Sequence, residues 1–359
     1  MRRALFGAVA VAAAARALAD DPQEWLQRME HALTSRNYEG VFVHEHSGQS
    51  ETLRILHRVS DGEVAERIVS MDGSGREFIR RGNELRCYLP DQKVVLVEKS
   101  PDAGLLLTEL RAANADGSGQ YESLDLGRAR VAGRDTRVIA VEPRDEFRYG
   151  YRIWIDERTA MPLKSQLRSV RGSVVEQLIF TSLTLPVQMS DAVLEPAVDA
   201  RAYRWLRYEA VPATASDAPA AAWQAAELPP GFRMTVRSAQ RLPGSGAAVT
   251  HLVFSDGMAS VSVFVEPEDA SGRGPAIPDS ASVGSSSAFS TTVDGHRITA
   301  IGEVPPDTVR AIARSLRPGN EANVDDGFGP PIRGLAGAAG RGPPTPAAGP
   351  RAGPRGGPR

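Results

Sequence analysis

Cysteine, lysine and long apolar runs are scarce in this chain of 359 residues, and the first and last of these scarcities each exclude a class of protein. Cys87 is the only cysteine, so neither an internal disulfide nor a CxxC redox or zinc motif can form. Lysine occurs only at Lys93, Lys99 and Lys164. No stretch reaches the roughly 20 apolar residues that a membrane-spanning helix needs. The sequence therefore predicts neither a disulfide-stapled scaffold nor an integral membrane protein.

Patterns typical of catalytic and nucleotide-binding sites are also missing. The Gly-Ser-Gly runs at Ser74, Ser118 and Ser245 lack the spacer residues of a hydrolase nucleophile elbow. No glycine cluster joins a strand to a helix, which excludes the P-loop and dinucleotide fingerprints. We therefore predict that the protein is not an enzyme, with no catalytic residue and no cofactor.

Three histidines are the best candidates for a metal site. His44 and His46 share one strand face, and His57 lies on the next strand. A turn at Gly48-Gln49, however, pairs His44 with Leu53 and His46 with Glu51, and leaves His57 at the far end. We therefore predict no metal site. Cys87 lies in a predicted strand in which polar and apolar residues alternate, and it has no CxxC partner. We therefore predict that it is a small apolar residue of the core.

Charge divides the chain into three segments. The first 19 residues carry +3 and residues 327–359 carry +5, with no acidic residue in either, so the formal −2 of the whole chain leaves −10 for the body. An acidic body argues against nucleic-acid binding, because that affinity depends on basic residues that neutralise phosphates.

The N-terminus has the features of a cleaved secretory signal, which we place at residues 1–19. Arg2 and Arg3 precede an apolar run from Ala4 to Ala15, and Ala17-Leu18-Ala19 has the small-x-small form of a cleavage site. Asp20 follows where a lipoprotein would have cysteine, so no lipid anchor is expected. These features predict a soluble exported protein.

Residues 20–209 read as one mainly β domain. A helix capped by Asp21 carries an apolar stripe from Trp25 to Leu33, and six short strands separated by turn residues follow up to Val97. An apolar patch at Leu105, Leu106, Leu107 and Leu110 reads as a short helix or lid. Strands then resume, giving about eleven or twelve in one unit, which predicts an incomplete, strongly curved antiparallel β-barrel.

Three further segments follow this domain. Residues 210–226, rich in alanine and proline, read as a linker. Residues 227–318 predict a smaller antiparallel αβ domain with five strands and a final helix from Pro305 to Leu316. Residues 319–359 decay into glycine, proline, alanine and arginine, which predicts a disordered tail.

Several short motifs, in order, resemble the RseB/MucB family of periplasmic sigma-E regulators. In the first domain they are Tyr38-Glu39-Gly40-Val41-Phe42-Val43, Leu53-Arg54-Ile55-Leu56-His57-Arg58, Met71-Asp72-Gly73, Arg81-Gly82-Asn83-Glu84, Ile153-Trp154-Ile155-Asp156 and Met161-Pro162-Leu163. In the second they are Phe254-Ser255-Asp256-Gly257, Ser260-Val261-Ser262-Val263, Ser290-Thr291-Thr292-Val293 and Gly302-Glu303-Val304-Pro305-Pro306. The resemblance covers about residues 21–317; the tail and the Ser/Gly-rich loop before Ser287 depart from it.

The resemblance implies a binding protein with an N-terminal domain similar to Lol-pathway lipoprotein carriers. Members hold the periplasmic part of a single-span anti-sigma factor (RseA/MucA-like), shield it from the site-1 protease, and release it on binding lipopolysaccharide or another acylated envelope lipid. A periplasmic lipid or lipoprotein carrier is the alternative function. Self-association into a homo-oligomer is left open.

Two groups of residues are the candidates for these functions. The lid leucines Leu105, Leu106, Leu107 and Leu110, with Val41 and Val43, are predicted to line an acyl-chain cavity, although a helix that only closes a barrel end fits equally well. The strand with Val261, Val263 and Val265, together with Pro305 and Pro306, is predicted to form a groove for the anti-sigma segment. Core packing of the small domain is the alternative for that second group.

Overall fold

The computed structural model describes residues 21–99, 119–208, 222–241, 248–267 and 280–319. The predicted signal, the lid leucines, most of the predicted linker and all but one residue of the tail lie outside these ranges, and the predictions about them stay predictions. None of the described helices is long and apolar enough to cross a membrane.

The first helix, α1 (Pro22–Ser35), forms as predicted. The Asp21 carboxylate accepts a hydrogen bond from the Gln23 backbone N–H at 3.1 Å, and Pro22 takes the first helical position. The apolar stripe of Trp25, Met29 and Leu33 is buried against the sheet that follows.

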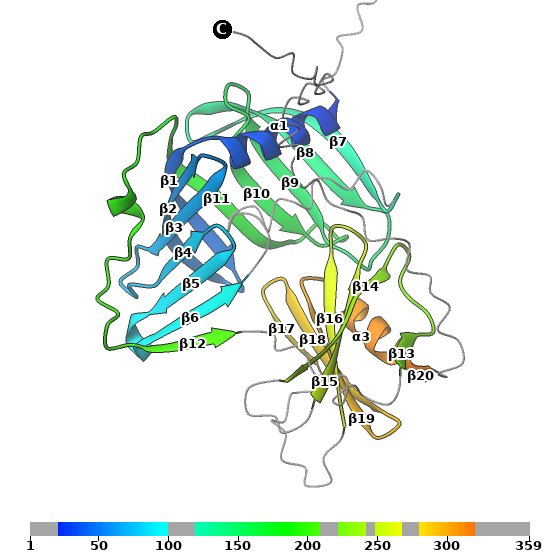
Figure 1. The fold of residues 1–359 in the computed structure, drawn as a ribbon. Helices are drawn as coiled ribbons and strands as arrows, with labels where there is room; N and C mark the ends of the chain where they lie inside the picture. The colour runs from blue at the N-terminus through cyan, green and yellow to red at the C-terminus, as the bar shows by residue number, and fades with distance from the viewer. Residues whose placement is uncertain (1–20, 100–118, 209–221, 242–247, 268–279, 320–359) are drawn as a thin grey trace, which may run out of the picture. The chain divides into compact units, whose positions relative to one another are not determined.

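Among the described residues, twelve strands make one open sheet (Figure 1). Its order is β12-β6-β5-β4-β3-β2-β1-β11-β10-β9-β8-β7, so β12 and β7 are the two edges. The strands are β1 (Tyr38–His46), β2 (Gln49–Ser60), β3 (Glu63–Ser70), β4 (Glu77–Arg81), β5 (Glu84–Leu89), β6 (Val94–Lys99), β7 (Tyr121–Val131), β8 (Arg134–Pro143), β9 (Gly150–Asp156), β10 (Pro162–Arg168), β11 (Val174–Thr184) and β12 (Arg204–Tyr208). The prediction of a mainly β chain is confirmed, and this sheet is not closed.

Short 3-10 turns complete this region: η1 (Pro90–Gln92) and η3 (Asp191–Leu194). The segment after β11 packs Val198, Ala200 and Tyr203 against a small cluster on β4, β5 and β6. This packing returns the chain to the sheet edge, where β12 pairs parallel to β6.

The first hairpin corrects a prediction. It turns at Ser47-Gly48, where φ is +51° and +73°, so His44 pairs with Glu51 and His46 with Gln49. Strand β7 continues through Gly127 (φ +92°), where the pairing with β8 is interrupted by a bulge.

The second part of the described chain contains a six-stranded antiparallel sheet in the order β14-β15-β16-β19-β18-β17. Its elements are β14 (Arg233–Arg241), β15 (Ala248–Ser255), β16 (Ser260–Pro267), β17 (Ser280–Val283), β18 (Ser286–Val293), β19 (His296–Gly302) and α3 (Pro306–Ser315), with a two-stranded pair of β13 (Ala222–Ala225) and β20 (Leu316–Gly319). The helix packs Val309, Ile312 and Ala313 onto one face of the sheet.

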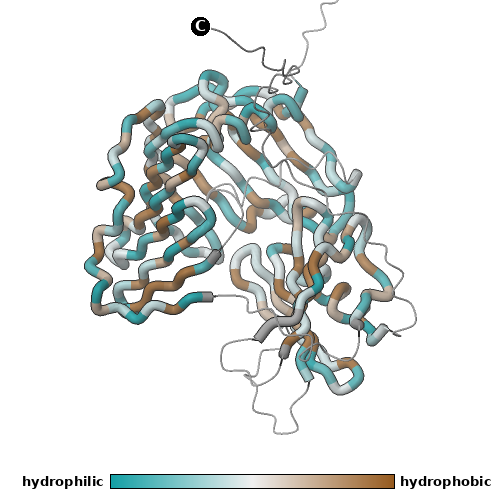
Figure 2. The backbone as a smooth tube through the Cα atoms, in the orientation of Figure 1, coloured by the Kyte–Doolittle hydropathy of each residue, from teal (hydrophilic) through white to brown (hydrophobic). Residues whose placement is uncertain are grey.

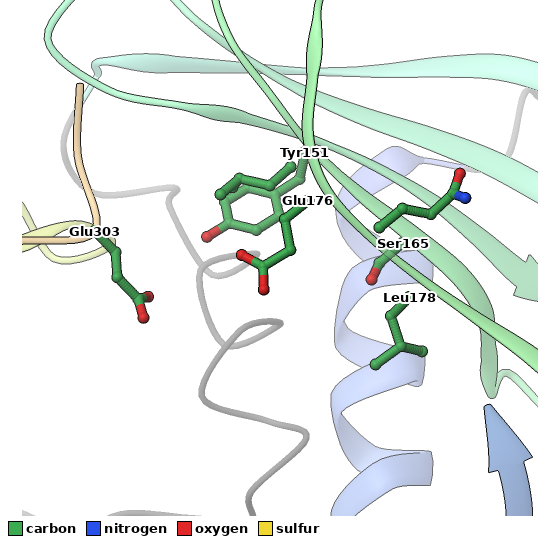
Figure 3. A pocket seen from close by; sticks show the side chains of 7 residues that line it. Tyr151, Ser165, Glu176, Leu178 and Glu303 are labelled. Atoms are coloured by element: carbon green, nitrogen blue, oxygen red, sulfur yellow. The ribbon is translucent and has the colours of Figure 1, made fainter. Parts of the chain in front are cut away.

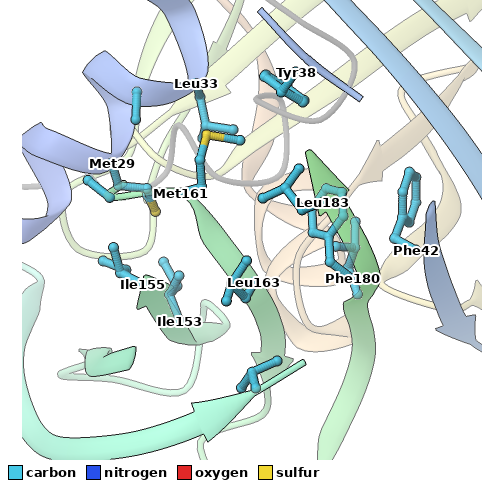
Figure 4. Packing of buried hydrophobic residues seen from close by; sticks show 14 of the residues in the cluster. Met29, Leu33, Tyr38, Phe42, Ile153, Ile155, Met161, Leu163, Phe180 and Leu183 are labelled. Carbon is cyan, nitrogen blue, oxygen red and sulfur yellow. The ribbon is translucent and has the colours of Figure 1, made fainter. Parts of the chain in front are cut away.

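The core of the twelve-stranded sheet lies under α1 (Figure 4). Met29 and Leu33 of the helix belong to one cluster with Ile153 and Phe180 of the sheet and with Met161, which directly precedes β10, and all of them are at most 1% exposed. We call the face that α1 covers the inner face and the opposite one the outer face. The inner face therefore carries the apolar core of the large sheet.

Candidate functional site

An apolar row crosses the inner face from the core to the β12 edge. Its members lie directly opposite one another on successive strands: Ile55, Ile68, Phe78, Cys87, Leu96 and Leu206. Ile55 is 0% and Ile68 8% exposed, and the remaining four side chains are half-buried. Figure 2 shows the hydrophobic colouring along β6. The row therefore carries apolar surface from the covered core to a partly open edge.

Cys87 contributes a neutral group to this row. Burial raises the pKa of its thiol, and the positive charge of Arg76 opposes this only in part. A protonated thiol packs as a small apolar side chain, as the sequence pattern predicted.

A polar row runs beside the apolar one on the same face. Tyr38, His57, Glu66 and Arg80 oppose one another on β1, β2, β3 and β4, and all are at most 5% exposed. The Tyr38 and His57 rings stack with centroids 4.6 Å apart. His57 Nε2 lies 3.7 Å from Glu66 Oε1, and Arg80 Nε lies 3.9 Å from Glu66 Oε2. Charged groups thus line up inside a mostly apolar face.

Burial controls the protonation of this row. It lowers the pKa of His57, although the contact of Nδ1 with the Arg36 carbonyl, 2.9 Å away, acts in the opposite direction. Burial and the Glu66 charge both hold the pKa of Tyr38 well above its usual range. Both shifts favour the neutral form, so the row presents an uncharged imidazole and phenol beside Glu66.

Strand alternation separates two of the predicted cavity residues from these rows. Val41 and Val43 alternate with Phe42 on β1, so they lie on the outer face and are half-buried there. The inner-face positions of the same strand belong to Tyr38, Gly40 and Phe42, which are buried.

The predicted groove residues of the smaller sheet also lie elsewhere than expected. Val261, Val263 and Val265 are at most 2% exposed and pack with α3 in the core, in keeping with the core-packing alternative. Pro305 precedes α3 as its N-cap residue, and Pro306 opens the helix with an exposed ring. Any partner contact made by these strands has to use the opposite face.

Two polar contacts connect the large sheet with the smaller one. The first, which we call the arginine junction, centres on Arg148 in the β8–β9 loop. Arg148 Nη1 donates to Asp256 Oδ2 at 2.5 Å, and both side chains are 0% exposed. Nε donates to Asp145 at 2.9 Å and Nη2 to the Pro230 carbonyl at 2.5 Å.

Neighbouring groups complete the arginine junction. The Tyr121 hydroxyl donates to Asp256 at 3.3 Å, and the Asp256 Oδ1 atom accepts the backbone N–H groups of Met258 and Ala259 at 2.8 and 2.7 Å. Thr308 donates to the Phe147 carbonyl at 2.6 Å. The Arg148 charge is therefore balanced by carboxylates, as a buried cation requires, while the Asp145 Oδ2 atom is buried without a hydrogen-bond partner among the described residues.

The second contact, which we call the acidic junction, surrounds a small hollow (Figure 3). Its volume is about 20 Å³, enough for about one water molecule. Glu176 of β11 and Glu303 of the β19–α3 loop lie at this hollow, which is lined by Tyr151, Ser165, Leu167, Glu176, Gln177, Leu178 and Glu303. His44 of β1 forms an ion pair with Glu176 and stacks on His46 with ring centroids 4.8 Å apart.

The two carboxylates of the acidic junction respond differently to their surroundings. Glu303 is exposed to solvent on one side, and partial desolvation at the hollow followed by the charge of Glu176 raises its pKa. Burial acts in the same direction on Glu176, but hydrogen bonds from His44 and Ser285 and the charges of His44 and His46 lower its pKa overall.

Two family models together match most of the chain. Residues 21–198 match the MucB/RseB N-terminal domain, and residues 217–317 match the MucB/RseB C-terminal domain. The chain belongs to the MucB/RseB family. The resemblance indicated by the short motifs is confirmed. It rested on several motifs that occur in the family's order rather than on any single motif.

Curated relatives in the MucB/RseB family are named as regulators of sigma factors. The chain is 33% identical over 307 residues to the sigma factor AlgU regulatory protein MucB of Pseudomonas aeruginosa, covering 84% of this chain and 92% of that protein. It is 28% identical to the sigma-E factor regulatory protein RseB of Escherichia coli, covering 81% and 89%.

Solved structures of MucB share the fold. The complex of Pseudomonas aeruginosa MucA and MucB matches with a TM-score of 0.63 at 29% identity, covering 84% of this chain and 99% of that one. MucB in complex with MucA(peri) matches with a TM-score of 0.61 at 30% identity, covering 84% and 100%.

Sequence reasoning missed the polar row and both junctions in this MucB/RseB family member. His57 and Glu66 have the strand parity of the buried Ile55 and Ile68, which is the signal that could have marked them as inward-facing. The junctions have no local signal, because Arg148 and Asp256 are 108 positions apart.

Proposed function

We propose that this protein is a periplasmic negative regulator of a sigma-E-type envelope stress response. It binds the periplasmic part of a transmembrane anti-sigma factor, shields that segment from site-1 proteolysis, and releases it when an envelope lipid binds. The likeness of both sheets to MucB bound to MucA(peri) carries this proposal. The proposed location rests on the predicted signal at residues 1–19.

The inner face supports the lipid part of the proposal. An acyl chain laid along the apolar row gains about 0.8 kcal/mol for each buried CH₂ group. The polar row lies beside it, with Arg80 and Tyr38 buried at 5% and 1% exposure, so a headgroup would reach these side chains only after a local rearrangement. Two parallel rows of opposite polarity match the two parts of an amphiphile.

Release follows from linkage between the two ligands. If lipid favours an arrangement of the protein that binds the anti-sigma segment less tightly, each ligand lowers the affinity for the other by the same factor. Calorimetry with the mature protein and the periplasmic segment of a MucA-like anti-sigma factor tests this. We expect micromolar or tighter binding that weakens with lipopolysaccharide; an absence of binding contradicts the proposal.

Cys87 provides a direct test of the lipid site, because it is the only thiol in the chain and lies within the apolar row. We expect an acylated lipid to slow the labelling of Cys87 by maleimide. Leu96→Asp places a carboxylate next to Cys87 in the row and should weaken binding of a fluorescent fatty-acid probe.

Val43→Asp is the matched control, because Val43 is a half-buried apolar residue on the outer face. Its probe binding should stay at the wild-type level. Weakened binding in Val43→Asp with unchanged binding in Leu96→Asp would move the lipid site to the outer face.

A periplasmic lipid or lipoprotein carrier is the second candidate, and the same two rows favour it. A carrier passes its ligand to an acceptor membrane, whereas a regulator only has to bind it. Transfer of a bound fluorescent lipid to acceptor vesicles, unaffected by the anti-sigma segment, would support the carrier.

A further inference from the structure

The two edges of the large sheet differ in how regular their strands are (Figure 1). An edge strand exposes backbone groups without partners, and proteins commonly protect such an edge with a bulge or with charged side chains. Strand β7 carries a bulge at Gly127, where its register with β8 shifts. Strand β12 pairs with β6 through all five of its residues without a shift. Within the described part of the chain, β12 is therefore a regular strand with one open side.

The direction of the β12 backbone groups follows from one hydrogen bond. The Arg204 backbone N–H donates to the Lys93 carbonyl at 2.9 Å, so Arg204 directs its backbone groups toward β6. Residues of a strand alternate in the side to which they direct their N–H and C=O groups. Trp205 and Arg207 therefore direct these groups away from β6. A further strand laid along the edge would find two donors and two acceptors.

The side chains make this edge basic. Arg204 is exposed, and no described carboxylate forms an ion pair with it. Arg207 is 57% exposed and lies 3.8 Å from Glu84, a carboxylate that Arg86 already contacts at 2.6 Å. Strand β12 has no acidic residue, and Glu98 of β6 lies opposite its last position. Positive charge therefore exceeds negative charge along the edge.

Trp205 adds an aromatic ring to the outer side of the same edge, and 41% of its surface is exposed. The Tyr88 ring lies nearly perpendicular to it with centroids 6.2 Å apart, and the Arg86 guanidinium lies 5.9 Å from the ring centroid. The indole N–H donates to the Ala200 carbonyl at 3.4 Å. Tryptophan, tyrosine and arginine are enriched among the residues that dominate protein interfaces. The edge thus combines a positioned aromatic ring with open backbone groups.

The two faces of the edge favour different neighbours. Alternation places Arg204 and Leu206 on the inner face, and Trp205 and Arg207 on the outer face. An added strand would place each of its side chains beside one of these four. The matching order along that strand is acidic, apolar, apolar, acidic, which is the same in both chain directions.

We propose that the β12 edge is a docking site for an extended acidic segment of a partner protein, which joins the large sheet as a further strand. Backbone hydrogen bonds to Trp205 and Arg207 hold the segment, and its carboxylates pair with Arg204 and Arg207. A second copy of β12 is a poor occupant, because its arginines would face these arginines. Lipid phosphates are also poor occupants, because they accept hydrogen bonds and leave the outward C=O groups without a donor.

This docking site goes beyond the proposed function, because it requires neither an envelope lipid nor an anti-sigma factor. Its test uses a synthetic peptide. The docking site can therefore fail while the proposed function holds, and it can hold while the proposed function fails.

A short peptide tests the chemistry of the edge. The capped peptide Thr-Glu-Val-Val-Glu-Thr has the matching order, and Thr-Lys-Val-Val-Lys-Thr is its charge-reversed control. We expect calorimetry with the mature protein to give a Kd below about 1 mM for the acidic peptide and no binding of the basic one. Binding of neither peptide, or equal binding of both, overturns the proposal.

Two substitutions at Arg207 separate the backbone from the side chain. Arg207→Ala removes the guanidinium and keeps the outward N–H, whereas Arg207→Pro removes both. Proline is tolerated where the N–H of an edge strand faces outward, so thermal unfolding of the two variants should be alike. We expect Arg207→Pro to bind the acidic peptide about five- to tenfold more weakly than Arg207→Ala, as for the loss of one hydrogen bond. Equal affinity of the two variants overturns the added strand.

Hydrogen exchange followed by NMR tests the same point without a substitution. At saturating acidic peptide, exchange of the Trp205 and Arg207 amides should slow. The amides of Arg204 and Leu206 face β6 and should keep their rates. Unchanged exchange at Trp205 and Arg207 contradicts an added strand, even if the peptide binds.

Other occupants of the edge give distinct results. Binding to phosphatidylglycerol vesicles that is lost in Arg204→Gln, but is equal in Arg207→Ala and Arg207→Pro, would assign the edge to an anionic membrane. A dimer in analytical ultracentrifugation that disappears in Arg207→Pro would assign it to a second copy of the chain. Either result overturns the acidic segment as the occupant.

Discussion

The arginine junction and the acidic junction show how two contacts between the same sheets can differ in burial and in the pairing of their charges. Arg148 is fully buried, and two carboxylates and a carbonyl accept hydrogen bonds from its guanidinium, so its charge is compensated. Glu303 is an exposed residue that lines the hollow with Glu176, and it forms no ion pair with a described basic side chain. We therefore expect the acidic junction to contribute less to stability than the arginine junction, where the cation is buried between carboxylates.

The largest expected effect comes from breaking the arginine junction. Asp256→Ala leaves Arg148 buried without its closest anion, which should lower the free energy of unfolding by about 3 to 5 kcal/mol. Urea denaturation measures this. Glu157→Ala is the control, because its partner Arg128 is 74% exposed and the loss should stay below about 1 kcal/mol. Equal losses in both variants would show that burial of the pair has no special role.

A smaller effect is expected at the edge of the arginine junction. Thr308→Val removes the hydroxyl that donates to the Phe147 carbonyl at 2.6 Å, which should cost about 1 to 2 kcal/mol. Thr308→Ser keeps a donor and should recover most of this loss. The comparison uses thermal unfolding of the two variants. A similar loss in both would attribute the effect to packing of the methyl group instead.

The smallest effect is expected at the acidic junction. Glu303→Gln removes one of two neighbouring negative charges, so it should raise the free energy of unfolding near pH 8 by less than about 1 kcal/mol. The gain should vanish as the pH falls to the ordinary carboxyl range, and salt should reduce it. Thermal unfolding at two pH values measures this. A gain that persists at acidic pH would indicate a cause other than charge.

Local patterns predicted the elements of this molecule well. The Asp21 cap, the stripe on α1 and the turn residues between β1 and β6 each lie within a few positions of the structure they specify. Strand β12 was missed because its parallel partner β6 lies more than 100 positions earlier in the chain. A parallel pairing of this kind leaves no turn signal.

The candidate site was predicted less well, for a physical reason. Alternation identifies which residues share a face, but register decides which strands bring them together. A one-residue error in the first hairpin turn is enough to misplace His44, which pairs with Glu51 rather than Leu53. Charged inward positions such as Glu66 become a row only after four strands are aligned.

Strand β12 has a mechanical consequence. It carries Leu206, the last member of the apolar row, and it is also the strand from which the chain leaves the large sheet toward the smaller one. Tension on the chain beyond Tyr208 would act along β12 and load its hydrogen bonds to β6 together, in shear.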